Sequence, residues 1–144
     1  MGVIAGGLVV AILDISEAFV FFGLRGVAPI RILQSIASGL LGRAAYSGGW
    51  STAALGALLQ VFIATTIVLV YHVASRKLVA LRQRPWVYGP IYGIAVYVVM
   101  NFVVLPLSAF GAKRLVLPVV VNGLFAHVFC VGLPSALFAR RAES

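Results

Sequence analysis

The sequence predicts an all-α integral membrane protein, a four-helix bundle with a short amphipathic helix between helices 1 and 2. Hydrophobic residues make up 62% of the chain and charged residues 10%, with a mean hydropathy of +1.12. The apolar residues also fall into four runs of about the length that a helix needs to cross the hydrocarbon core. These runs do not alternate and are too few for a closed barrel, which argues against strands. The 144 residues are expected to form a single membrane domain, 1–144.

The first apolar run, 2–24, is expected to remain as a span, because it lacks a basic start and a small-residue cleavage site. Asp14 and Glu17 lie inside it, three residues apart, and therefore share one face of a helix. Each acid costs about 2.5–3.5 kcal/mol in a span, which roughly offsets the gain from the run's thirteen Leu, Ile, Phe and Val residues. Acids of this kind usually face the bundle interior or a water-filled cavity. We expect them to be paired, protonated or hydrated.

The connection to the second span is long enough to hold a helix of its own, predicted over about 29–42 with Pro29 at its start. Its expected apolar face consists of Ile32, Leu33, Ile36 and Leu40. Its expected polar face consists of Arg31, Ser35, Ser38 and Gly42. Two interpretations are open. The helix lies along the membrane interface, or it is re-entrant and brings Arg31 to Asp14 or Glu17, since a buried acid is stabilised by a cation.

The remaining spans are predicted at about 51–75, 86–109 and 115–139. Pro134 lies well inside the last of them and is expected to bend that helix or end it early. Gly89 and Gly93 have the G-x-x-x-G spacing that lets helix backbones approach closely. A stripe of the second span is expected to face neighbouring helices: Ala53, Ala57, Gln60 and Ala64.

Four spans place both chain ends on one side of the membrane. With the ends inside, six Lys and Arg residues are inside and five outside. The dense basic group within 76–84 favours the cytoplasm for that side. We therefore expect cytoplasmic termini, although a difference of one residue leaves dual insertion open.

Polar residues of the other spans are expected to approach the two acids. Gln60, Asn101 and Asn122 are predicted at the depth of Glu17, and His127 lies near the middle of its span. His127 could exchange protons with Asp14, because imidazole titrates near neutral pH, or it could be a hydrogen-bonded packing residue. The candidate intramembrane polar site is therefore Asp14, Glu17, Arg31, Gln60, Asn101, Asn122 and His127.

Other classes of function have no support in the sequence. It contains no zinc-spaced His or Cys cluster, no phosphate-binding loop and no nucleophile elbow, so neither an enzyme, a metal site nor a cofactor is expected. The net charge of +8 is distributed in short groups between the apolar runs. That distribution is typical of a protein that meets anionic lipid rather than nucleic acid.

Three stretches, 31–50, 92–109 and 122–141, resemble a group of small uncharacterised four-helix bacterial inner-membrane proteins and, more distantly, YagU-like inner-membrane proteins. This resemblance implies the bacterial inner (plasma) membrane and no defined activity. An acid in the first of four spans is also similar to small multidrug-resistance exporters, whose first-helix carboxylate alternates between a proton and a cationic drug. Asp14 would take that role, although the chain is longer and has a second acid.

Two functions follow from these patterns. The first is a non-catalytic multi-pass protein whose polar residues pack the bundle or bind membrane lipid or a protein partner. The alternative is a proton-coupled small transporter or channel that uses the first-helix carboxylates. Stripes of small residues are compatible with a homo-oligomer in either case.

Overall fold

The computed structural model describes residues 2–109 and 116–142, and every regular element in this part of the chain is helical. Four helices are long and apolar enough to cross a membrane: Gly2–Leu24, Gly49–Lys77, Pro85–Leu107 and Leu117–Arg141. The expected all-α fold with four candidate spans is thus confirmed. Residue 115, the predicted start of the last span, lies outside the described residues.

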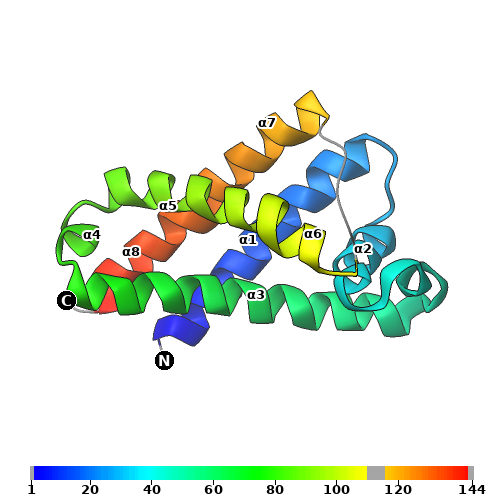
Figure 1. The fold of residues 1–144 in the computed structure, drawn as a ribbon, viewed down its shortest axis with the longest axis horizontal. Coiled ribbons are helices and arrows are strands. Elements are labelled where there is room, and N and C mark those ends of the chain that lie inside the picture. Colours follow the sequence, from blue (N-terminus) through cyan, green and yellow to red (C-terminus); the bar gives the residue numbers. More distant parts are fainter. Residues whose placement is uncertain (1, 110–115, 143–144) are drawn as a thin grey trace.

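The elements follow one another in a simple up-and-down order (Figure 1). The first half consists of α1 (Gly2–Leu24), α2 (Pro29–Leu41), the 3-10 turn η1 (Gly42–Ser47) and α3 (Gly49–Lys77). The third candidate span combines α5 (Pro85–Val99), the π-helical stretch η2 (Met100–Val104) and α6 (Leu105–Leu107), and the short α4 (Ala80–Gln83) precedes it. The fourth combines α7 (Leu117–Ala126), the π-helical stretch η3 (His127–Gly132) and α8 (Leu133–Ala142).

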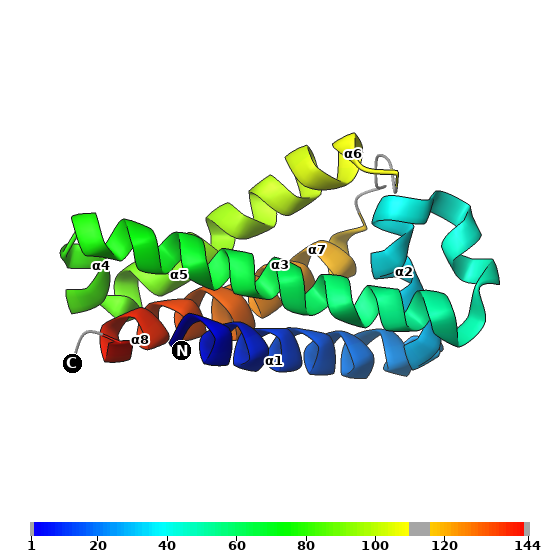
Figure 2. The same cartoon turned by 90° about the horizontal axis from the view of Figure 1, so that it is seen from below.

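The start of α1 and the end of α8 lie at the same end of the bundle, together with α4 (Figures 1 and 2). A Cβ placed on Gly6 of α1 would lie 3.1 Å from the ring of Phe138 in α8, so the two helices touch here. We call this the terminal end. The opposite end, which holds α2 and α6, is the far end.

Close backbone contacts join α5 to the fourth span. A Cβ on Gly93 would lie 2.2 Å from the carbonyl oxygen of His127, and one on Gly132 would lie 2.2 Å from the carbonyl oxygen of Gly89. Only hydrogen fits at such positions, so the close contact predicted from Gly89 and Gly93 is confirmed.

The predicted stripe of small residues on α3 is correct except at one position. Ala53 and Ala64 are buried, but Ala57 is exposed, and Gly56 takes its place on the inner face. A Cβ at Gly56 would lie 1.9 Å from the carbonyl oxygen of Leu33. The missing side chain is therefore what allows α2 to rest directly on α3.

Proline explains both π-helical stretches. A proline lacks an amide hydrogen, and its ring collides with the carbonyl group four residues earlier. That carbonyl belongs to Phe102 for Pro106 and to Cys130 for Pro134, so each lies within the π-helical stretch before its proline. Of the two outcomes expected at Pro134, a bend or an early end, the early end is wrong, because wider turns relieve the collision and the helix continues to Ala142.

At the far end, α3 and α6 lie on opposite sides of α2 (Figure 2). The side-chain amide of Gln34 in α2 donates to the carbonyl of Gly49 at 3.1 Å, and the amide of Ala109 donates to the carbonyl of Gly39 in α2 at 3.0 Å. These two bonds attach α2 to both neighbouring spans. As a result, α2 fills part of the space between α3 and α6 at this end of the bundle.

The faces predicted for α2 need correction. Its buried residues are Ile32, Gln34, Ala37 and Ser38, whereas Leu40, expected on the apolar face, is 62% exposed. Ser38 can be buried because its hydroxyl donates to the carbonyl of Ser35 in the same helix.

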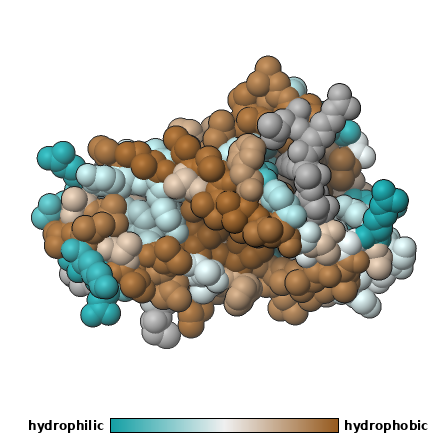
Figure 3. Space-filling model, in the orientation of Figure 1, coloured by the Kyte–Doolittle hydropathy of each residue, from teal (hydrophilic) through white to brown (hydrophobic). Residues whose placement is uncertain are grey.

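On the face drawn in Figure 3, apolar residues gather toward the middle of the bundle and the most hydrophilic residues lie toward the two ends. Ile12 of α1 and Phe62 of α3, for example, are 60% and 68% exposed. Apolar flanks between polar ends are what helices in contact with lipid require.

Candidate functional site

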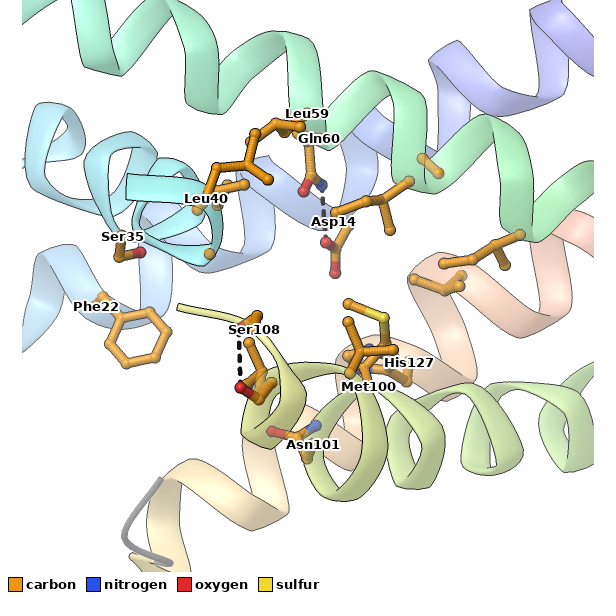
Figure 4. A pocket seen from close by; sticks show the side chains of 18 residues that line it. Asp14, Phe22, Ser35, Leu40, Leu59, Gln60, Met100, Asn101, Ser108 and His127 are labelled. Carbon is orange, nitrogen blue, oxygen red and sulfur yellow. Dashed lines mark hydrogen bonds between the residues drawn. The ribbon is translucent and has the colours of Figure 1, made fainter. Parts of the chain in front are cut away.

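A cavity of about 430 Å³ lies between α1, α2, α3, the η2–α6 segment and η3 (Figure 4). Aliphatic and aromatic side chains form most of its wall, among them Phe22, Leu59 and Ile63. Six polar side chains also line it: Asp14, Ser35, Gln60, Asn101, Ser108 and His127. Four of the seven residues predicted from the sequence therefore meet around one cavity.

Asp14 is the only acid along the described cavity wall, and it comes from the middle of α1. Its Oδ2 atom accepts a hydrogen bond of 2.8 Å from Nε2 of Gln60 in α3. The same nitrogen lies 3.4 Å from the carbonyl oxygen of Ala11. The carboxylate points into the cavity (Figure 4), and no Lys or Arg is among the described residues that line it. Among the described residues, the side chain that binds this carboxyl group is a neutral amide and not a cation.

His127 enters the cavity from the start of η3. Its Nδ1 atom lies 2.8 Å from the carbonyl oxygen of Gly123, one helical turn earlier. A carbonyl oxygen only accepts, so this geometry assigns the proton to Nδ1 and leaves the Nε2 lone pair of the neutral ring available. The ring of Tyr97 packs edge-to-face against the imidazole, with centroids 5.3 Å apart. His127 is therefore fixed in orientation by the Gly123 carbonyl and by the Tyr97 ring.

The other polar groups of the wall are satisfied within their own segments. Asn101 Nδ2 donates to the carbonyl of Tyr97 at 3.0 Å. The hydroxyl of Ser35 donates to the carbonyl of Ile32 at 2.6 Å, and that of Ser108 donates to the carbonyl of Leu105 at 2.8 Å. These bonds use both hydroxyl donors and one of the two Asn101 amide hydrogens, so most of the remaining polar atoms on the wall are acceptors.

Glu17 and Asn122 form a separate polar pair beside the cavity. The Asn122 side chain hydrogen-bonds to the Glu17 carboxylate, and Asp14 and Cys130 are close enough to interact electrostatically with it. Neither member of the pair lines the cavity. Asn122 and His127 thus face different partners, as their separation of about 140 degrees around a helix requires.

The structure does not bring Arg31 to either acid. Its side chain is exposed, and its guanidinium lies 5.4 Å from the ring centroid of Tyr46. On α2 the neighbouring residue Ile32 points inward instead. The neighbour of the Arg31 guanidinium is thus the aromatic face of Tyr46 and not a carboxylate.

The sequence did not single out two of the lining residues, Ser35 and Ser108. Ser35 was placed on the polar face of its helix, but nothing in the sequence indicated that this face borders a cavity. Among the described residues, no group of three or more His, Cys, Asp or Glu side chains could hold a metal ion.

Comparisons of the chain with protein-family models, curated proteins and solved structures found no match.

Proposed function

We propose that this chain is a non-catalytic multi-pass membrane protein that binds a small amphipathic molecule in the cavity, with Asp14 as its polar anchor. The observation that carries the proposal is a carboxyl group that points into a mostly apolar cavity and that, within residues 2–109 and 116–142, is bound by one neutral side chain. A carboxylate that only locked helices together would gain most from being surrounded by donors. The carboxyl group of Asp14 instead has one side turned toward the cavity.

The cavity wall defines the class of ligand. An anionic group beside acceptor atoms favours a ligand that donates hydrogen bonds or carries positive charge, because desolvating an unpaired charge is costly. The apolar wall formed by Phe22, Leu59 and Ile63 suits a hydrophobic body. The volume of about 430 Å³ falls within the range of small-molecule sites. A small ammonium compound with an apolar tail has both features.

The cellular setting belongs to the same proposal. The chain would lie in a bacterial inner membrane with both termini in the cytoplasm, in contact with lipid and with no nucleic-acid partner. Exposed apolar flanks on all four spans are compatible with lipid contact and with a homo-oligomer.

Binding is tested with purified protein and two probes of similar shape, benzylammonium and benzyl alcohol. Wild type is expected to bind the cation more tightly, and Asp14→Asn should lose that preference while remaining folded. Glu17→Gln is the matched control, since it removes the same charge from the same helix outside the cavity wall. Equal preference in Asp14→Asn and wild type would refute the proposal.

A second function, proton-coupled transport, is favoured by one specific observation. Asp14 and His127, a carboxyl group and an imidazole, line the same cavity, and the imidazole is held in place at Nδ1. A transporter of this kind would release protons when the cation binds. Wild type in weakly buffered solution should then acidify the medium on addition of benzylammonium, and Asp14→Asn should not. Binding without proton release would leave the first function standing and remove the second.

A further inference from the structure

The terminal end of the bundle carries basic side chains from three elements. Arg76 and Lys77 end α3, Arg84 follows α4, and Arg140 lies in the last turn of α8. All four are exposed. Figure 3 shows hydrophilic residues gathered at this end of the molecule, next to the apolar flank. We call these four residues the terminal basic cluster.

A small rigid core holds the cluster together. Tyr71 packs with Ala136 and Ala139 of α8 and with Leu81 of α4, and its hydroxyl donates to the carbonyl of Leu81 at 2.7 Å. Arg82 Nε donates to the carbonyl of Ser75 at 3.1 Å, which ties α4 to the end of α3. Arg140 directly follows Ala139, which belongs to the same core as Leu81 of α4. Packing therefore concentrates positive charge that would repel itself in the absence of an anion.

The cluster differs from the basic residues at the far end. There the guanidinium groups of Arg25 and Arg31 lie 5.5 Å and 5.4 Å from the ring centroids of Phe21 and Tyr46. Both acids that the structure describes belong to the middle of α1, away from either end. At the terminal end, therefore, no acid of the described residues neutralises the cluster.

We propose that the terminal basic cluster binds the phosphate of an anionic phospholipid headgroup, which bridges α3, α4 and α8. The position fits, because residues at the ends of spans lie at the depth of the lipid phosphates. A phosphate between the helices would replace repulsion with charge-assisted hydrogen bonds. The lipid would thereby stabilise the folded bundle, independently of any ligand in the cavity.

The test is the thermal unfolding midpoint of the purified chain in neutral detergent, with phosphatidylglycerol or phosphatidylcholine added. Wild type is expected to gain several degrees with the anionic lipid and little with the zwitterionic one. The double variant Arg84→Gln/Arg140→Gln should lose this gain and, without lipid, be at least as stable as wild type. Arg25→Gln/Arg31→Gln is the matched control at the far end and should keep the gain.

Two results would overturn the proposal. One is an equal gain from phosphatidylglycerol in both double variants, which would mean that the lipid acts through charge in general. The other is a full gain from inorganic phosphate at the same concentration, which would identify a free anion as the ligand. Should Arg84→Gln/Arg140→Gln fail to fold, Arg76→Gln/Lys77→Gln at the end of α3 provides the same comparison.

Discussion

Replacing Gly93 with alanine tests the close packing of α5 against the fourth span. The new methyl group would lie 2.2 Å from the carbonyl oxygen of His127 and 2.8 Å from Cα of Val128. The shorter distance is about 1.2 Å inside the 3.4 Å at which ordinary contact begins. Both contacts are backbone atoms, so no side chain can turn aside, and the two helices have to separate.

The expected cost follows from two opposing terms. Overpacking in a well-packed interior costs about 1–3 kcal/mol, and a backbone collision belongs at the upper end of that range. Alanine in a helix is favoured over glycine by about 0.8–1.0 kcal/mol. The free energy of unfolding should therefore fall by about 2 kcal/mol. Gly39→Ala is the control, since its methyl group would meet nothing within 4 Å, and it should be neutral or slightly stabilising.

The assay is reversible unfolding of both variants and of wild type in mixed micelles of fixed composition, followed by circular dichroism. If Gly93→Ala were as stable as Gly39→Ala, the helices could not approach as closely as described. A destabilisation of equal size in both variants would contradict the reasoning as well, because it would not depend on the backbone contact.

Three further predictions concern single bonds. Tyr92→Phe removes the 2.6 Å bond from its hydroxyl to an α3 carbonyl and should lower the free energy of unfolding by about 0.5–1.5 kcal/mol; no loss in the micelle assay would exclude that bond. Gln60→Leu should lower the free energy of unfolding by about 1–3 kcal/mol in wild type and by less in the Asp14→Ala background. An equal loss in both backgrounds would mean that the Gln60 amide does not stabilise the Asp14 carboxyl group. Pro134→Ala should produce a slowly exchanging amide at that position, bonded to Cys130 or its neighbour; fast hydrogen exchange would count against proline as the cause of the π-helical stretch.

The number of candidate spans and their approximate ends could be predicted from the sequence, because the length of an apolar run alone decides whether a helix can cross a membrane. The G-x-x-x-G spacing was also sufficient to predict the close contact at Gly89 and Gly93. The order of polar and apolar residues did not predict the inner face of α2, since Ser38 can be buried once its hydroxyl bonds within its own helix. The π-helical stretches were missed for another reason. A proline predicts the loss of one backbone hydrogen bond, but it does not predict whether the helix bends, ends or widens at that point.

The candidate site was predictable in composition but not in arrangement. Asp14, Gln60, Asn101 and His127 could be grouped by their depth along the spans, and they do line one cavity. Depth says nothing about rotation around the helix axis, so the separation of Glu17 from that cavity could not be foreseen. The cavity itself arises because α3 and α6 lie apart with α2 between them, an arrangement that depends on tertiary packing.

The Asp14 carboxyl group faces the cavity inside the bundle rather than the outer surface. Access to that cavity and its charge are measured by the reaction rates of Asn101→Cys, in a Cys130→Ser background, with cationic and anionic methanethiosulfonate reagents. Asn101 lines the cavity. We expect the cation to react several-fold faster, Asp14→Asn to remove this preference and Glu17→Gln to retain it. A cysteine that reacts no faster than one at the exposed position of Phe62 on the outside of the bundle, or a preference that survives Asp14→Asn, would contradict this expectation.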